Sequence, residues 1–220
     1  MNISDYLNKF PITISLIVAN TVISLIGFSS GEFVDKTIMW PYRVAREKQY
    51  IRFITSGFLH ADFMHLFFNM FTLFFFGSAI EYYFKAYNLG GNIAYLSLYF
   101  LALIISDIPT YLKYKNNSQY RSLGASGAVS AVVFAAIVFS PWTSIYLYGA
   151  LRISAGVYAI LFLIYCVYMG KKGADNINHD AHLWGALCGI VFTVALIAFM
   201  DPQLFDSIIE NLKHPSLFGR

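Results

Sequence analysis

Ser126 is the first residue whose type and neighbours suggest chemistry, because it lies between two glycines in the segment Gly124-Ala125-Ser126-Gly127. Glycines let the backbone turn tightly and let other groups come close. The segment opens a long uncharged run, and a helix that starts there presents unpaired N–H groups and the positive end of its dipole, which suit a developing oxyanion. Small residues are also common where membrane helices pack. This segment alone therefore fits either a nucleophile or helix packing.

Four more polar side chains lie in otherwise apolar stretches: His60, His65, Asn69 and His182. His65 and Asn69 are four residues apart, so they share one face of a helix and could both donate to the same oxygen. A histidine within hydrogen-bond reach of Ser126 would act as its general base. His182 opens the last apolar run and is the candidate for that role. Each histidine taken singly is more often a structural residue than a catalytic one.

The composition is that of a membrane protein. Of the 220 residues, 58% are hydrophobic and 12% are charged, whereas soluble domains carry roughly 25% charged residues. The net charge of +3 is small, and no basic patch with interleaved aromatic residues occurs, so we expect no nucleic-acid partner. The expected surroundings are the lipid bilayer.

The two cysteines, Cys166 and Cys188, lie within apolar runs. Their positions predict neither a disulfide framework nor a zinc site, and they are interpreted as small core residues. The zinc-protease motif H-E-x-x-H is absent, since His60 and His65 are five apart and lack the glutamate. We therefore expect no metal and no cofactor.

About 20 apolar residues cross a bilayer, and six segments approach that length. The predicted spans are residues 11–28, 58–83, 92–112, 124–139, 153–169 and 182–200. The sequence thus predicts an all-α bundle of six transmembrane helices in one domain, residues 1–202. Residues 203–220 form a short C-terminal tail with apolar residues at near-helical spacing.

The direction of the spans predicts where the polar side chains meet. Even-numbered spans all run in the same direction, so their first turns share one level of the bilayer. Ser126, His182, His65 and Asn69 can therefore converge in one pocket. Ala181, Gly185 and Gly189 form a small-residue stripe at four-residue spacing, which lets another helix approach beside His182.

Three stretches together resemble the rhomboid intramembrane serine proteases. They are His60-Ala61-Asp62-Phe63-Met64-His65-Leu66-Phe67-Phe68-Asn69, Gly124-Ala125-Ser126-Gly127, and Ala181-His182-Leu183-Trp184-Gly185-Ala186-Leu187-Cys188-Gly189. Their order and their spans match the family, so the resemblance extends from Arg52 to Asp201. It implies a six-span rhomboid-like bundle.

The resemblance also implies residue roles. Ser126 would be the nucleophile and His182 its base. His65, Asn69 and the Ser126 backbone N–H would form the oxyanion hole, with Gly124 as a further candidate. The supporting residues would be His60, Arg52, Glu81, Gly127, Gly185 and Gly189. Asp180, two residues from His182, would point away from it, so a Ser–His dyad is expected rather than a triad.

The chain departs from the family at two positions. Ile51 precedes Arg52, where the family usually has tryptophan. Ser130 stands four residues after Ser126, where some members carry an aromatic residue that stacks on the base. The orientation is also open, because the lysine and arginine distribution predicts that the long first loop is cytoplasmic, whereas the resemblance implies cytoplasmic termini.

The predicted activity is hydrolysis of peptide bonds in or near the transmembrane segments of membrane proteins, in a bacterial cell membrane. Such substrates would unwind locally to expose their backbone. Two alternatives remain: a non-catalytic rhomboid-like protein that binds membrane clients, and a small transporter. The paired repeats that are common in transporters are not evident in the sequence.

Overall fold

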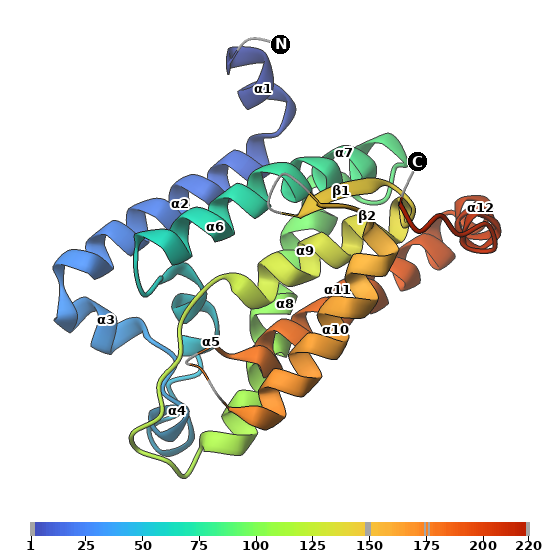
Figure 1. Ribbon diagram of the computed structural model, residues 1–220. Coiled ribbons are helices and arrows are strands. Elements are labelled where there is room, and N and C mark those ends of the chain that lie inside the picture. Colours follow the sequence, from blue (N-terminus) through green and yellow to red (C-terminus); the bar gives the residue numbers. More distant parts are fainter. Residues whose placement is uncertain (1–2, 148–150, 174, 176, 219–220) are drawn as a thin grey trace.

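The computed structural model describes residues 3–147, 151–173, 175 and 177–218, and it is mostly helical (Figure 1). The elements are α1 (Ile3–Lys9), α2 (Pro11–Ser29), α3 (Gly31–Thr37), α4 (Pro41–Glu47), α5 (Arg52–Thr55), η1 (Ser56–Phe58), α6 (Phe63–Thr72), η2 (Leu73–Gly77), α7 (Ser78–Ala86), α8 (Gly91–Tyr114), α9 (Ser126–Phe139), β1 (Ser144–Leu147), β2 (Leu151–Ser154), α10 (Ala155–Lys172), α11 (His179–Met200) and α12 (Pro202–Leu212).

Five helices in the described part of the chain are long and apolar enough to cross a membrane. They are Pro11–Ser29, Phe63–Ala86, Gly91–Tyr114, Ala155–Lys172 and His179–Met200. The second of them joins α6 and α7 through the π-helical segment η2. The protein is therefore an integral, multi-pass membrane protein.

Side-chain caps explain where three of these helices begin. The Asp62 side chain accepts the His65 N–H at 2.8 Å, so the second long helix starts at Phe63 and residues 58–62 lie outside it, contrary to the prediction. Ser154 caps α10. Asn178 caps α11, whose first residue, His179, lies three residues before the predicted start at 182. The fifth predicted span begins at residue 153, but residues 151–154 form a β-strand and the helix starts at Ala155.

The fourth predicted span, α9, is a shorter apolar helix of 14 residues. Its length is about 21 Å, less than the roughly 30 Å hydrocarbon core of a bilayer. Every residue of α9 except Ser126 and Val138 is buried. The helix lies in the middle of the bundle, where it packs against α8 and α11 (Figure 1), so its N-terminus is inside the protein.

The small-residue stripe of α11 packs directly on the backbone of α9. A Cβ atom at Gly185 would collide with the carbonyl oxygen of Gly127, and one at Gly189 would collide with that of Ala131. On another side of α9, a Cβ at Gly127 would collide with the Ser106 hydroxyl of α8. Glycine at these positions is therefore what lets α9 approach its neighbours closely.

Glu81 of α7 is fully buried and caps a neighbouring helix. Its carboxylate accepts the backbone N–H groups of Ile12 and Thr13 at 3.1 and 2.9 Å, at the start of α2. Lys85 contacts the same carboxylate at 2.9 Å. Glu81 thus satisfies donors that a helix start leaves unpaired, which is a structural role.

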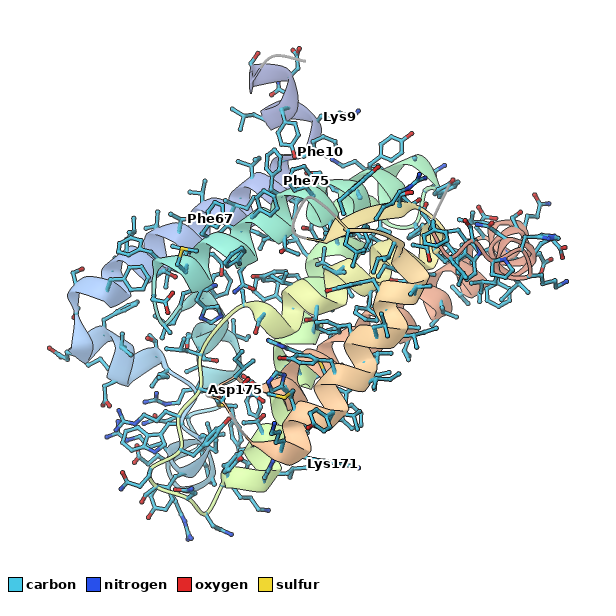
Figure 2. All side chains as sticks on the ribbon, viewed as in Figure 1. Lys9, Phe10, Phe67, Phe75, Lys171 and Asp175 are labelled. Atoms are coloured by element: carbon cyan, nitrogen blue, oxygen red, sulfur yellow. The ribbon has the colours of Figure 1, made fainter. Side chains whose placement is uncertain are left out.

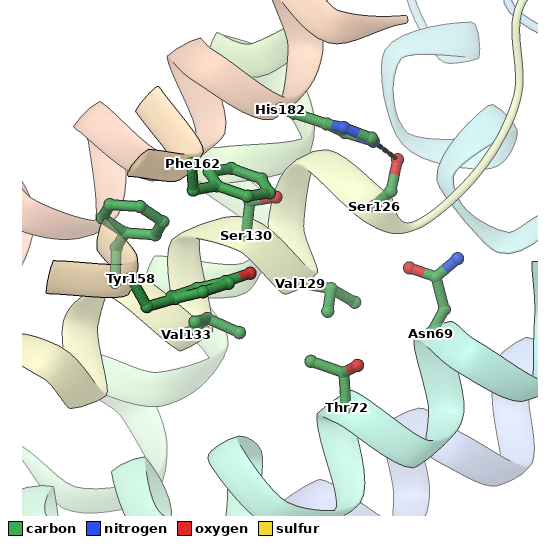
Figure 3. Close-up of a pocket in the computed structure, with 10 residues that line it drawn as sticks. Asn69, Thr72, Ser126, Val129, Ser130, Val133, Tyr158, Phe162 and His182 are labelled. Carbon is green, nitrogen blue, oxygen red and sulfur yellow. Dashed lines mark hydrogen bonds between the residues drawn. The ribbon is translucent and has the colours of Figure 1, made fainter. Parts of the chain in front are cut away.

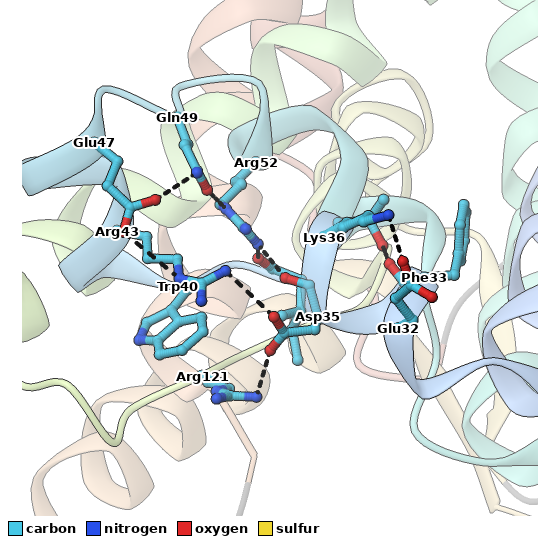
Figure 4. A network of polar contacts seen from close by, with 12 residues as sticks. Glu32, Phe33, Asp35, Lys36, Trp40, Arg43, Glu47, Gln49, Arg52 and Arg121 are labelled. Carbon is cyan, nitrogen blue, oxygen red and sulfur yellow. Dashed lines mark hydrogen bonds and ion pairs between the residues drawn. The ribbon is translucent and has the colours of Figure 1, made fainter.

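The first loop, residues 30–62 between α2 and α6, includes α3, α4, α5 and η1. It is organised around the buried guanidinium of Arg52 (Figure 4). Arg52 donates to the carbonyl oxygens of Asp35 and Ile38 at 2.9 and 2.7 Å, and burial lowers its pKa. The Asp35 carboxylate in turn binds Arg43 and Arg121 at 3.2 and 3.1 Å. Arg121 comes from the segment that leads to α9, so the network ties the first loop to that segment.

The Trp40 ring lies against two guanidinium groups, with Arg43 at 4.1 Å and Arg121 at 3.8 Å from the ring centre. Through these cation–π contacts, one ring of the first loop holds a guanidinium of the same loop and one of the segment before α9. Two backbone hydrogen bonds of 3.0 Å between Met39 and Ser122 continue the connection. The first loop therefore supports the residues immediately before Ser126.

The remaining elements lie outside the central bundle. The hairpin β1–β2 was not expected from the sequence, whereas α12 occupies the tail where near-helical spacing was seen. Phe67 of α6 and Phe75 of η2 point outward from the bundle (Figure 2), and each is 55% exposed. Such side chains suit a lipid-facing surface.

Candidate active site

Ser126 and His182 lie side by side at the starts of two packed helices. Ser126 is the first residue of α9, and His182 is in the first turn of α11. The Ser126 Oγ and the His182 Nε2 are 2.7 Å apart (Figure 3). If Nε2 is the unprotonated nitrogen, it accepts the serine hydroxyl, which is the geometry of a nucleophile and its base.

Phe162 of α10 lies beside the His182 ring, with the ring centres 6.3 Å apart and the planes inclined by 27°. Its position explains how the base can be oriented although Ser130 is not aromatic. Ser130 lies one turn after Ser126 and faces the same cavity (Figure 3). Phe162 could not be predicted from the sequence, because α10 is apolar on all sides and its sequence does not indicate which side faces His182.

His65 and Ser126 both lie beside Gly124. Gly124 has a φ of +126°, and a Cβ placed there would lie 2.8 Å from the His65 Cε1 and 3.8 Å from the Ser126 Oγ. Glycine is therefore required both by the backbone conformation and by the imidazole beside it. The Ala61 N–H lies 3.4 Å from the His65 Nδ1. A neutral His65 that accepts there carries its proton on Nε2 and can donate it.

Asn69 is buried and lines the cavity across from Ser126 (Figure 3). Its amide nitrogen donates to the carbonyl oxygen of His65 at 3.0 Å. The side chain thus has one donor hydrogen held by its own helix and one left for the cavity. The structure places Asn69 at the same cavity as Ser126 and His182.

The cavity has a volume of about 140 Å³ and opens beside Ser126 and His182. Its walls are formed by Asn69, Thr72, Ser126, Val129, Ser130, Val133, Phe134, Tyr158, Phe162 and His182. Small-molecule pockets are typically about 300–1,000 Å³, so this cavity suits a single side chain or a short backbone segment. The sequence analysis did not identify Thr72 or Tyr158.

A second, smaller pocket of about 10 Å³ lies on the other side of Ser126. Its polar lining includes Ser106, Asp107, Ser122 and Asn178. A volume of this order is close to the minimum for one water molecule, and the polar groups supply the partners that a buried water needs. Water can therefore be held next to Ser126.

His60 lies outside the second long helix and does not contact Ser126. Its Nδ1 is 2.8 Å from the Ser24 Oγ of α2, and that hydroxyl donates to the Phe58 carbonyl. The His60 Nδ1 is therefore the donor. Burial lowers the pKa of His60 to about 3, so the ring is neutral and ties the loop to α2.

The other candidates occupy supporting positions. Gly127, Gly185 and Gly189 form the contacts of α9, whereas Arg52 and Glu81 hold the first loop and the start of α2. Asp180 lies 3.3 Å from the Lys113 ammonium. The Asp180 carboxylate thus forms an ion pair with a side chain of α8.

Residues 47–199 match the model of the Rhomboid domain, and the chain belongs to the rhomboid family. The chain is 32% identical to the mitochondrial RHOMBOID-like protein 12 of Arabidopsis thaliana over 60% of the chain and 42% of that protein. It is 26% identical to Rhomboid-like protein 15 of the same plant over 99% of the chain and 55% of that protein. The chain thus spans about half the length of these two plant relatives.

A bacterial relative matches over most of both chains. The putative rhomboid protease YdcA of Bacillus subtilis (strain 168) is 28% identical over 86% of this chain and 89% of its own length. The rhomboid family includes intramembrane serine proteases.

Proposed function

We propose that the protein is an intramembrane serine endopeptidase, with Ser126 as nucleophile and His182 as general base. The single observation that carries this proposal is the 2.7 Å contact between the Ser126 Oγ and the His182 Nε2 at the edge of a cavity. The rhomboid domain over residues 47–199 supports the same reaction class. We also propose that α9 is the fourth of six spans in a bundle comprising residues 1–202, followed by a tail of residues 203–220.

In the proposed reaction, the Ser126 Oγ attacks a peptide carbonyl carbon while the His182 Nε2 takes the hydroxyl proton. The negative charge that develops on the carbonyl oxygen is stabilised by the Ser126 backbone N–H, the His65 Nε2–H and the Asn69 amide. His182 then gives its proton to the leaving amine, and the acyl-serine ester remains. Water beside Ser126 hydrolyses that ester and restores the hydroxyl.

The proposed substrates are transmembrane segments of other proteins. Peptide backbone inside a helix is hydrogen-bonded, so the segment must unwind before Ser126 can attack it. Small or helix-breaking residues lower the cost of unwinding. For the location we propose a bacterial cell membrane, which is supported by the extent of the match to the Bacillus subtilis relative.

The test is cleavage of a model transmembrane substrate by the purified full chain in detergent and in vesicles. We expect Ser126→Ala and His182→Ala each to lose at least about 10³-fold in rate, since members of a catalytic unit fail together. Ser130→Ala, one turn further along the cavity wall, is the matched control and should retain cleavage. Activity that survives either dyad substitution contradicts the proposal, and substrate binding without cleavage favours the client-binding alternative.

A further inference from the structure

Three side chains of types that commonly bind metal ions lie close together at the candidate active site. Cys166 is on α10, and His179 and His182 are on α11. Their potential ligand atoms all lie within 4.8 Å of one another. His179 and His182 are three residues apart and so share a face of α11, while Cys166 shares a face of α10 with Phe162.

His179 carries an unexplained polar atom that points to a ligand. The residue is only 3% exposed, yet its Nδ1 has no hydrogen-bond partner among the described residues. Leaving a buried polar atom unpaired is costly. Its Nε2 lies 3.1 Å from the Asp175 carboxylate, and this bond lowers the pKa of Asp175.

The Asp175–His179 pair has the arrangement that prepares a histidine for metal binding. A carboxylate that accepts the proton of one ring nitrogen fixes the tautomer, so the other nitrogen offers its lone pair. Here the carboxylate holds Nε2 and leaves Nδ1 available. Asp175 lies in the connection between α10 and α11, at the same end of the bundle as Lys171 (Figure 2), and its side chain is 30% exposed.

We propose that a zinc ion binds to Cys166, His179 and His182 and reversibly switches off the proposed protease. One thiolate and two imidazoles are typical zinc ligands, and three protein ligands leave a fourth position for water. In a tetrahedral zinc site the ligand atoms are about 3.3–3.7 Å apart, from metal–ligand bonds of about 2.0–2.3 Å. Rotations of the three side chains that close their separations by about 1 Å complete the site.

The inhibition follows from the two nitrogens of His182 and rests on the proposed function. Zinc on Nε2 displaces the Ser126 hydroxyl directly. Zinc on Nδ1 leaves the neutral ring with its proton on Nε2, which then donates instead of accepting. In both cases Ser126 loses the group that takes its proton.

Metal binding is tested separately from activity, with Co²⁺ as a coloured substitute for Zn²⁺. We expect the full-chain Ser126→Ala protein in detergent to bind one equivalent of Co²⁺ and to show a thiolate-to-cobalt charge-transfer band that Zn²⁺ removes. Cys166→Ala should abolish the band, and His179→Gln should weaken binding at least tenfold. Cys188→Ala, at the other buried cysteine, is the matched control and should retain the band. Absence of the band, or its survival in Cys166→Ala, overturns the site.

The inhibitory role is tested by cleavage, with each variant compared with its own metal-free rate. Zn²⁺ should inhibit the wild type and the Cys188→Ala variant, and a chelator should restore the rate. Cys166→Ala and His179→Gln should need at least tenfold more Zn²⁺. A cobalt band without zinc inhibition of a cleaving chain overturns the switch but not the metal site. A chain that binds cobalt but never cleaves overturns the proposed function, and the switch with it, and leaves the metal site standing.

Discussion

His182 and His65 are the two imidazoles nearest Ser126, and their neighbours fit them to opposite hydrogen-bonding roles. The His182 Nε2 lies 2.7 Å from the Ser126 hydroxyl, and a base needs that nitrogen unprotonated. The His65 Nδ1 faces the Ala61 N–H, which leaves the ring proton on Nε2. One ring can therefore take a proton from serine while the other donates to an oxyanion.

This division predicts a graded loss of activity. Removing one oxyanion donor typically lowers kcat by about 10²–10³-fold. The kcat of His65→Ala and of Asn69→Ala should each fall by that factor, and by less than the kcat of Ser126→Ala. The measurement is kcat and KM for one transmembrane substrate, with Thr72→Val on the same cavity wall as control. Unchanged kcat in Asn69→Ala would show that the amide held by the His65 carbonyl does not serve the oxyanion.

The low pKa of His60 predicts that the folded protein becomes less stable as the pH falls. Its pKa is about 3 in the folded protein against 6.5 as the ordinary value, so the unfolded chain binds the proton first as pH falls. The contribution of neutral His60 to the free energy of unfolding is fully present above pH 6.5. It is lost progressively between pH 6.5 and 3, by up to ~1.4 kcal/mol per pH unit.

The measurement is thermal unfolding in detergent between pH 7 and pH 4. His60→Asn keeps a donor for Ser24 but cannot titrate, so its melting temperature should fall less over this range than that of the wild type. Equal slopes for the two proteins would mean that His60 does not carry this sensitivity.

At the scale of elements, the contact between α9 and α11 determines the distance from Ser126 to His182. Gly185 lies about one turn after His182 on α11, against the Gly127 carbonyl. The sequence predicted a close helix approach here, because small residues recur at four-residue spacing. It also predicted that His182 and Ser126 begin their helices at one level.

Gly185→Ala should push the two helices apart. Overpacking of this kind typically costs about 1–3 kcal/mol, and a misplacement of about 1 Å at a catalytic group can cost 10²-fold in rate. We expect a lower melting temperature and a loss of cleavage of about that size. Gly31→Ala, where no atom lies within 4 Å of the added Cβ, is the control and should change neither. Full activity of Gly185→Ala would contradict the role of this contact.

Other elements could not be predicted, for identifiable reasons. The ring of Phe162 and the thiol of Cys166 reach His182 from α10, but an evenly apolar helix gives no periodic signal for its inner face. The contacts of Arg52 with the Asp35 and Ile38 carbonyls depend on loop geometry that has no period at all. The second long helix begins at Phe63 because of a cap on Asp62, which the continuous apolar run conceals.

At the scale of the whole molecule, the shortness of α9 explains how the polar side chain at its start can lie inside an otherwise apolar protein. The helix is about 21 Å long, which is less than the roughly 30 Å of hydrocarbon. Other parts of the chain must therefore fill the membrane at the depth of Ser126. The first loop does this through the Asp35–Arg121 ion pair and the Met39–Ser122 pairing. The predicted segment, residues 124–139, begins only two residues before α9, but hydropathy does not report how neighbouring loops fill the remaining space.

The central claim is that Ser126 is an activated nucleophile, and covalent labelling of the folded protein tests it most directly. We predict that a fluorophosphonate probe modifies Ser126, as located by mass spectrometry of the intact protein and its peptides. Labelling should disappear in Ser126→Ala, fall strongly in His182→Ala and persist in Ser130→Ala. Failure of the folded wild type to react, or equal labelling with and without His182, would contradict the account.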